Sequence, residues 1–347
     1  MRAIRRSRYG GPETLEIADV EDEPLEEGRV RLRVAAASLN PFEWHHLRGL
    51  PWLMRPTSGW RHPRNPGLGV DVAGVVTEVA DDVADLRVGD AVFGVARNSL
   101  AESATARAEY LVRIPDGVEP EAAAAVPLAG LTALQALRDQ GQMTAGSRVL
   151  ILGAAGGVGH YAVQVARALD AGRVVASCSG RNASWVEGLG ADRVLDYTRG
   201  EVDDIDERFD VILDIAGGAR IAYLRSLLAP GGSLVLVGGP GDGMLLGPAT
   251  RIFGGLIASR FRRERVVGVN ATWSGPDLAI LAAMLRDGCV RTVIHRIVGL
   301  ADVPTAIAEL EDGHVPGKFV VRPMSDEGTR EPNNAPSWSG LNPRQRY

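Results

Sequence analysis

The most informative segment of this chain is Val149-Leu150-Ile151-Leu152-Gly153-Ala154-Ala155-Gly156-Gly157-Val158-Gly159. A continuous apolar run leads into a glycine-rich turn, and an apolar pattern of helical period follows from His160 to Ala166. Between a strand and a helix, such glycines let the backbone approach a pyrophosphate at the helix N-terminus. The sequence therefore predicts a dinucleotide site, and a nicotinamide enzyme is the leading hypothesis.

The glycine pattern is a variant of Gly-x-Gly-x-x-Gly. The spacing that fits best is Ala154-x-x-Gly157-x-Gly159, with Gly153 closing the strand. A glycine cluster alone is often only a loop. The strand before it and the helix after it make that interpretation less favourable here.

A second predicted strand, residues 173–177, ends at Cys178-Ser179-Gly180-Arg181-Asn182. An enzyme specific for NAD would place Asp or Glu about 20 residues beyond the glycines, close to Ser179, to bind the ribose. The segment contains no carboxylate. Its hydroxyl, arginine and amide suit a 2′-phosphate, with which Arg181 can pair through a fixed fork of donors. The alternative is that Arg181 is only a solvated loop residue. Its position after the second strand favours NADPH instead.

Composition narrows the class of protein. The 347 residues, 45% of them hydrophobic, are enough for two domains with ordinary cores. The net charge of −5 argues against general nucleic-acid affinity. Two cysteines exclude a disulfide framework and favour a reducing compartment. No apolar run reaches membrane-spanning length, and the basic N-terminus lacks the apolar core of a secretory signal. We expect a cytoplasmic protein, with a mitochondrial presequence as a weaker alternative.

The order of predicted elements indicates an α/β fold with a doubly wound parallel sheet and a second, β-rich domain. Short strand-like runs at 30–35, 74–79, 90–94 and 109–112 are separated by turns. Helical composition begins at about residue 119. Further strands at 149–152, 173–177, 210–215 and 233–237 then alternate with helical segments.

Six further segments, in a fixed order, carry a family resemblance: 36–41, 71–76, 88–94, 124–133, 188–192 and 313–318. With the glycine turn, they make the chain similar to the medium-chain dehydrogenase/reductase superfamily, within its zinc-free quinone oxidoreductase-like (zeta-crystallin-like) branch. The resemblance runs from Met1 to about Pro323.

The resemblance implies a GroES-like catalytic domain split between residues 1–126 and 270–324. The Rossmann NADPH-binding domain would span 127–269, with the active site in the cleft between the two domains. The tail 325–347, rich in Pro, Asn, Ser and Arg, is predicted to be disordered. A homodimer through the edge strand Arg265-Val266-Val267-Gly268-Val269 is also implied, and an ordinary internal strand is the alternative.

The resemblance also bears on zinc. Zinc-bearing relatives have a catalytic Cys in the first loop, a Gly-His-Glu segment and a four-Cys lobe. Here Ser38-Leu39-Asn40-Pro41 and Gly69-Val70-Asp71 occupy the first two places, and the lobe cysteines are missing. Catalytic zinc needs three protein ligands. The nearby His45, His46 and His62 are more often satisfied or solvated side chains, so we predict no metal site.

Without zinc to stabilise an alkoxide, the expected acceptor is already electrophilic, such as a quinone or an α,β-unsaturated carbonyl compound. Asn40, from the loop where zinc enzymes place a ligand, is the predicted catalytic hydrogen-bond donor; turn chemistry before Pro41 is its alternative. Thr132 resembles a nicotinamide-side contact, with helix packing as its alternative. Both are predicted catalytic residues.

The resemblance places the cofactor contacts on three parts of the chain. They are the turn residues Ala155, Gly156, Gly157 and Val158, then Ser179, Arg181 and Tyr197 at the adenosine phosphate, and Lys318 near the nucleotide. An ordinary strand-end tyrosine is the alternative for Tyr197.

The acceptor pocket is less well defined by the sequence. Trp44, Trp52 and Trp60 cluster in the first long loop and are candidates for aromatic walls. Family members often have a tyrosine near Trp52, and none stands there. The overall prediction is a zinc-independent, NADPH-dependent oxidoreductase with a small-molecule substrate. A pathway-specific enoyl or enone reductase, a zinc-free alcohol dehydrogenase-like enzyme and a non-catalytic NADPH-binding protein remain as alternatives.

Overall fold

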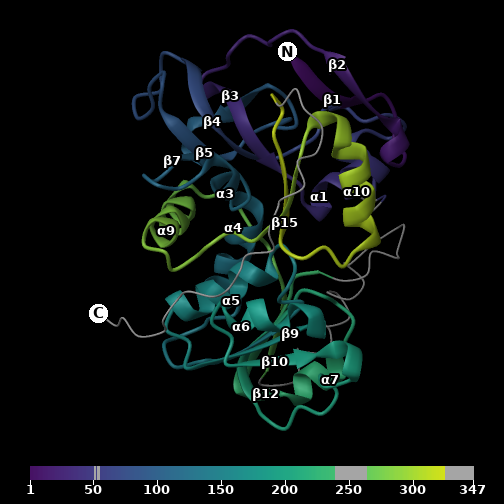
Figure 1. Ribbon diagram of the computed structural model, residues 1–347, viewed down its shortest axis with the longest axis vertical. Helices are drawn as coiled ribbons and strands as arrows, with labels where there is room; N and C mark the ends of the chain where they lie inside the picture. The colour runs from purple at the N-terminus through teal and green to yellow at the C-terminus, as the bar shows by residue number, and fades with distance from the viewer. Residues whose placement is uncertain (51, 53–54, 239–263, 325–347) are drawn as a thin grey trace.

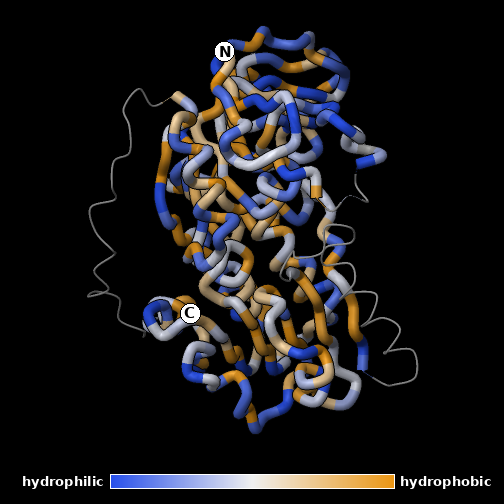
Figure 2. Tube along the Cα trace, turned by 90° about the vertical axis from the view of Figure 1, so that its right-hand side faces the viewer, coloured by the Kyte–Doolittle hydropathy of each residue, from blue (hydrophilic) through white to orange (hydrophobic). Residues whose placement is uncertain are grey.

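The computed structural model describes residues 1–50, 52, 55–238 and 264–324. The chain forms two halves, each built on its own sheet (Figure 1). In Figure 1 the N-terminal sheet lies in the upper half and the second sheet in the lower half. Hydrophobic segments concentrate inside both halves, and hydrophilic segments lie mostly at the outside (Figure 2).

The lower half contains a six-stranded parallel sheet in the order β10-β9-β8-β11-β12-β13. Its strands are β8 (Arg148–Leu152), β9 (Arg173–Cys178), β10 (Arg193–Asp196), β11 (Phe209–Asp214), β12 (Leu228–Leu236) and β13 (Arg265–Gly268). Numbered within the sheet, this order is 3-2-1-4-5-6, which is the order of dinucleotide-binding domains. The predicted α/β fold is confirmed. The ligand edge of such a sheet lies where the order reverses, beyond the end of β8.

Three helices connect strands of this sheet: α5 (Gly159–Ala168), α6 (Ala183–Glu187) and α7 (Ile221–Ser226). Before its first strand lies α4 (Pro127–Gln135), continued by a π turn (Ala136–Gln140). After its last strand, α9 (Gly275–Arg286) packs on α4 and on the upper half of the molecule. The α5 helix is almost wholly buried, and its own apolar side chains, among them Tyr161, Val163 and Val165, belong to the hydrophobic core. It is therefore a fixed support for the turn that precedes it.

The upper half contains a seven-stranded sheet in the order β14-β15-β3-β4-β5-β7, with β6 paired to β3. Its strands are β3 (Arg29–Ser38), β4 (Asp71–Val79), β5 (Ala91–Val95), β6 (Ser103–Arg107), β7 (Leu111–Arg113), β14 (Ile294–Val298) and β15 (Lys318–Val321). Two strands from the end of the chain thus complete the sheet of its first part. Val320 lies opposite Ser38 in the antiparallel β15–β3 pair.

Smaller elements surround this sheet: the hairpin β1 (Arg2–Arg6) and β2 (Leu15–Asp19), and the helices α1 (Pro41–Arg48), α2 (Arg55–Ser58), α3 (Pro120–Ala124) and α10 (Val303–Asp312). One sequence prediction was wrong in detail. Residues 108–110 form a 3-10 turn, and the strand predicted at 109–112 begins only at Leu111.

Two further predictions concern the strand β13 and the tail of the chain. β13 pairs only with β12 and forms one edge of the six-stranded sheet as described, so the internal-strand alternative does not apply to these residues. The tail 325–347 lies outside the described residues. Within the described part, none of the helices combines the length and apolarity that a membrane span requires.

Candidate active site

The glycine turn after β8 leaves its backbone open. Gly153 has φ +87°, which favours glycine. A Cβ on Gly159 would collide with the Gly153 carbonyl oxygen, so only glycine allows α5 to begin so close to the strand. At Gly156 a Cβ would meet nothing nearer than that same oxygen, at 3.5 Å. The turn fits a pyrophosphate because its glycines themselves place no side chain over the peptide groups at the start of the helix.

Lys318, the first residue of β15, joins this turn to the other half of the molecule. The backbone N–H of Gly317 donates to the Ala155 oxygen at 2.8 Å. The Lys318 side chain is 3% exposed and passes Gly157, where a Cβ would lie 3.1 Å from its Cδ. Its Nζ donates to the Leu39 oxygen at 2.9 Å and to Asn40 Oδ1. Three predicted site residues, Gly157, Asn40 and Lys318, are therefore adjacent.

Asp71 is the centre of the polar cluster at Asn40. Its carboxylate is fully buried at the start of β4. Oδ2 accepts hydrogen bonds from Ser38 Oγ at 2.7 Å and from Asn40 Nδ2 at 2.9 Å, and Oδ1 accepts one from the Leu128 N–H at 2.9 Å. Lys318 Nζ lies 3.6 Å from Oδ2. Asp71 and Lys318 form a buried ion pair. Neutral groups make the other hydrogen bonds of both side chains. We call these five side chains and backbone groups the Asp71 centre.

Asn40 is fixed from both ends of its amide. It is 3% exposed, donates one Nδ2 hydrogen to Asp71 and accepts from Lys318 at Oδ1. The Nδ2 group has a second hydrogen. Among the described residues none accepts it, so it is available to a ligand.

Glu43 adds a protonated carboxyl beside the cluster. The side chain is fully buried in α1, and its Oε2 accepts from the Asn40 backbone N–H at 2.6 Å. Burial, and secondly the charge of Asp71, raise the pKa of Glu43 to about 8. Burial also lowers the pKa of Lys318, against the opposing effect of Asp71 and Glu43. With Glu43 protonated, Asp71 and Lys318 are left as the ion pair of the cluster.

Thr132 lies in α4, near the same centre. Its hydroxyl donates to the Leu128 oxygen at 2.7 Å, and the N–H of that residue is the donor to Asp71. Thr132 is 7% exposed. Because its proton is used within the helix, its oxygen can meet a ligand only as an acceptor.

Ser179, Arg181 and Tyr197 form a separate group at the ends of β9 and β10. Ser179 Oγ accepts from Asn182 Nδ2 at 3.1 Å. Arg181 is exposed, and no carboxylate pairs with it among the described residues. Tyr197 is 45% exposed rather than packed at the strand end.

A carboxylate that the sequence pattern did not reveal lies at the same place. Asp196 ends β10, beside β9, and a Cβ on Gly180 would collide with its Oδ2. Its Oδ1 accepts hydrogen bonds from Thr198 N and Oγ1 at 2.9 and 2.7 Å, which contribute to lowering the pKa of Asp196. An anion therefore borders the position assigned to the 2′-phosphate.

The histidines near Asn40 are not arranged as a metal site. His46 Nδ1 is bonded to the Phe42 oxygen at 3.0 Å, and the His45 ring stacks on Trp44 at 3.6 Å. Burial lowers the pKa of both imidazoles. No group of three or more His, Cys, Asp or Glu side chains in the described part of the chain could hold an ion. Asn40 and Asp71, which stand where zinc-bearing relatives have zinc ligands, are hydrogen-bonded to each other. This set of residues therefore does not fit zinc.

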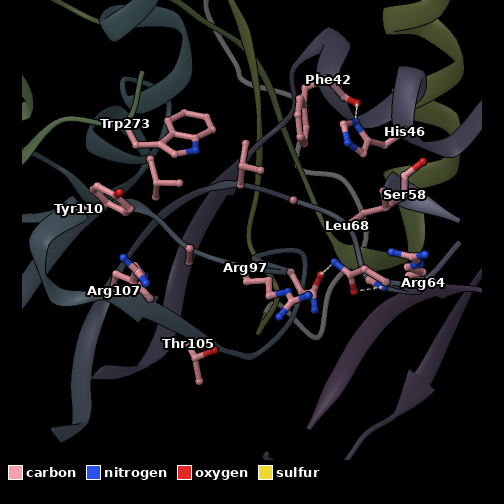
Figure 3. Close-up of a pocket in the computed structure, with 18 of the residues that line it drawn as sticks. Phe42, His46, Ser58, Arg64, Leu68, Arg97, Thr105, Arg107, Tyr110 and Trp273 are labelled. Atoms are coloured by element: carbon pink, nitrogen blue, oxygen red, sulfur yellow. Dashed lines mark hydrogen bonds between the residues drawn. The ribbon is translucent and has the colours of Figure 1, made fainter. Parts of the chain in front are cut away.

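A cavity of about 560 Å³ is lined by residues that neighbour the Asp71 centre in sequence, although none of the five groups of that centre lines it. Phe42 and Val70, which line it, are close in sequence to Asn40 and Asp71. Figure 3 shows Tyr110 and Trp273 on one side of this cavity and Phe42 and His46 on the other. The predicted aromatic walls are elsewhere: Trp60 is 69% exposed, and neither it nor Trp44 or Trp52 lines the cavity.

Comparisons with known proteins agree with this architecture. Residues 26–116 match the family model described as alcohol dehydrogenase GroES-like domain, and residues 189–321 match the one described as zinc-binding dehydrogenase. The chain is 32% identical over 337 residues to the chloroplast envelope quinone oxidoreductase homolog of Arabidopsis thaliana, covering 93% of this chain and 98% of that protein. The chain belongs to the medium-chain dehydrogenase/reductase superfamily, in its quinone oxidoreductase branch.

Two further members of the superfamily show how wide the similarity is. A mitochondrial NAD(P)H oxidoreductase of Mus musculus is 32% identical, over 84% of this chain and 81% of its own length. The structure of the quinone oxidoreductase from Coxiella burnetii superposes with a TM-score of 0.79 at 29% identity, covering 93% of this chain and 99% of the other.

Sequence reasoning did not single out Asp71, Glu43 or Ser38 as site residues. Asp71 had a signal, because it is a carboxylate at the start of an apolar run that extends to Val76. Glu43 also had one, because an Asn followed three residues later by Glu is the pattern of a capped helix start. Ser38 had none, since its role depends on the side chain of another strand.

Proposed function

We propose that this protein is a zinc-independent, NADPH-dependent reductase of quinones or α,β-unsaturated carbonyl compounds. The observation that carries the proposal is the contact of Lys318 with both the open glycine turn and the Asn40 side chain. This contact supports the proposal because it brings the open turn and the Asn40 amide close together between the two sheets.

The chain's own residues divide the binding of NADPH into two tasks. The backbone of Ala155, Gly156, Gly157 and Val158 would bind the diphosphate at the start of α5. Ser179, Arg181 and Tyr197 would bind the 2′-phosphate, with Arg181 as the charged donor. NADPH supplies the two electrons and one hydrogen of the reduction as a hydride.

Asn40 would stabilise the charge that develops on the acceptor oxygen. Its free Nδ2 hydrogen is the donor, while Asp71 and Lys318 keep the amide from rotating. A neutral donor suits an acceptor that delocalises its own charge, and a preorganised one needs no reorientation during the reaction. Thr132 would accept a hydrogen bond from the nicotinamide carboxamide.

Absence of zinc from the working enzyme, assembly as a homodimer through β13 and a cytoplasmic location belong to the same proposal. The hydrogen bond between Asn40 and Asp71 supports the absence of zinc. The edge position of β13 supports the dimer. The two unpaired cysteines support a reducing compartment such as the cytoplasm.

The test is NADPH oxidation by chelator-treated protein with 1,4-naphthoquinone, a simple enone and the matching saturated ketone. We expect turnover with at least one conjugated acceptor and very slow turnover with the saturated ketone. Brisk reduction of the saturated ketone, or loss of activity with the removal of stoichiometric zinc, would overturn the proposal. NADPH binding without oxidation by any acceptor would identify a non-catalytic binding protein instead.

A further inference from the structure

The cavity of about 560 Å³ is unusually basic. Of the twenty described residues that line it, five are arginines and none is acidic. They come from different parts of the upper half of the molecule: Arg6, Arg29, Arg64, Arg97 and Arg107. We call this set the arginine wall. In Figure 3 Arg97 lies between Arg107 on one side and Arg64 on the other.

Arg6 is the most informative member of the wall. It ends β1 and is 4% exposed, yet its Nε and one terminal nitrogen (Nη1) have no hydrogen-bond partner in the described part of the chain. Its guanidinium carbon lies 5.6 Å from the centre of the Tyr9 ring. A cation–π contact of this length offsets only part of the cost of removing a guanidinium from water.

The neighbours of Arg6 do not neutralise it. His46 also lines the cavity, and its Nδ1 is hydrogen-bonded to the Phe42 oxygen. Burial, and to a smaller extent the charge of Arg6, lower the pKa of His46. Burial lowers the pKa of Arg6 as well. A buried charge with unsatisfied donors is unfavourable unless an anion reaches it.

The other arginines differ in their pairing. Arg29 and Arg107 are paired with Glu26 and Glu109 at 2.6 and 2.7 Å. Arg97 is exposed toward the cavity, and no carboxylate pairs with it among the described residues. The wall therefore offers two guanidinium groups, those of Arg6 and Arg97, whose charge the described residues leave unbalanced.

We propose that the cavity binds an acceptor that carries an oxyanion, a carboxylate or a phosphate, at the end away from its reducible carbonyl group. This inference rests on the proposed reductase function and names its substrate class. The reducible end would lie toward Asn40, and the anionic end would pair with Arg6 and Arg97. Phe42, Tyr110 and Trp273 provide apolar surface between the two ends. The cavity volume is within the range of small-molecule sites.

The experiment uses matched acceptors of equal reactivity: a naphthoquinone with a carboxyalkyl chain, its methyl ester, and the corresponding alkyl phosphate. In the parent protein, kcat/KM for at least one anionic quinone should exceed that for the ester by about tenfold or more, through KM. Arg6→Met should bring this ratio close to one by raising KM for the anionic quinones. Arg97→Gln should lower it partly.

Two control variants distinguish loss of the anion site from unrelated effects. Arg6→Lys should retain part of the preference, and Arg286→Met, an exposed arginine of α9, should retain all of it. If Arg6→Met fails to fold, Arg97→Gln and Arg6→Lys still decide. Equal kcat/KM for both anionic quinones and the ester in the parent, or an anion preference unchanged by Arg6→Lys and Arg97→Gln, would overturn the inference while the reductase function stands.

Binding without chemistry distinguishes failure of the function from failure of the inference. The dimethyl ether of the reduced carboxyalkyl quinone has no reducible group, and its affinity can be measured by calorimetry. If no quinone oxidises NADPH but this acid binds the parent at least tenfold more tightly than Arg97→Gln, the proposed function fails and the anion site remains. Equal affinity in the two proteins overturns the site.

Discussion

Two buried cations in the upper half of the molecule have opposite surroundings. Lys318 is 3% exposed and lies within reach of Asp71 and two neutral oxygens. Arg6 is 4% exposed and has two nitrogens without a partner in the described part of the chain. Lys318 is neutralised by the protein and serves to position Asn40. The charge of Arg6 is available to a ligand. Equal burial therefore does not imply equal function, because the difference lies in the countercharge.

The largest effect should follow from removing the paired cation. Lys318→Met leaves Asp71 buried without its countercharge and should lower the free energy of unfolding by about 3–5 kcal/mol. Urea denaturation measures the loss. Adding Asp71→Asn to this variant should recover part of the stability, since both charges are then gone. A loss below about 1 kcal/mol would show that the Asp71 centre does not depend on this pair.

Glu43 allows the electrostatics of the Asp71 centre to be tested by pH. Its pKa is raised to about 8 in the folded state, so the folded protein keeps a proton that the unfolded chain releases above pH of about 4. The contribution of Glu43 to stability is complete below the unfolded pKa and is lost as pH rises to about 8. Glu43→Gln should not show this loss and should exceed the parent by up to about 4 kcal/mol at pH 8.5.

The measurement for Glu43 is urea denaturation from pH 5 to 8.5. Glu26→Gln, whose side chain is 71% exposed, is the control and should follow the parent across this range. Parallel curves for Glu43→Gln and the parent would contradict the protonated state assigned to Glu43.

Asn40 tests whether the positioned amide takes part in the reaction. Asn40→Ala should lower kcat by about 10²–10³, the effect of losing an oxyanion donor, while NADPH affinity changes little. Steady-state rates with a quinone and the dissociation constant for NADPH measure the two effects. Parallel losses of rate, cofactor affinity and stability would instead mean that Asn40 only maintains the loop.

Arg181 extends the comparison to an exposed cation in the other half of the molecule. It has no carboxylate partner among the described residues, so we expect NADPH to bind several-fold more tightly than NADH. Arg181→Ala should remove about 1–3 kcal/mol of that preference. Calorimetry with both cofactors measures it, and Arg148→Ala, at the opposite end of β8, is the control. Equal affinity of the parent for both cofactors would show that Asp196 outweighs Arg181.

The smallest effect should come from Arg6, as the counterpart of Lys318. Arg6→Met replaces an unpaired buried charge by an apolar side chain of similar length, so the free energy of unfolding should stay unchanged or rise by about 1 kcal/mol. The same denaturation experiment measures it in the absence of ligands. A loss as large as that of Lys318→Met would mean that Arg6 has a structural role after all.

The sequence predicted the lower half of the molecule better than the cavity. The glycine turn and the parallel strands were predictable because local apolar runs and turn residues determine them. The Asp71 centre was predicted only in part, because Asn40 and Lys318 are 278 residues apart and only the β15–β3 pairing brings them together. The arginine wall could not be predicted, since its members come from separate strands and loops. Asp196 escaped notice for the same reason: it reaches Gly180 from a neighbouring strand.

In the proposed reaction the nicotinamide delivers hydrogen to a carbon atom of the acceptor, next to Asn40. The most direct test uses NADPH deuterated in turn at each face of nicotinamide C4, with an enone whose reduced product is analysed by mass spectrometry and NMR. We predict that one of the two labels appears at the β-carbon of the saturated ketone in the parent protein, and at a rate lowered about 10²–10³-fold in Asn40→Ala. An unlabelled product with both cofactors, or no consumption of NADPH with enones and quinones alike, would contradict the account.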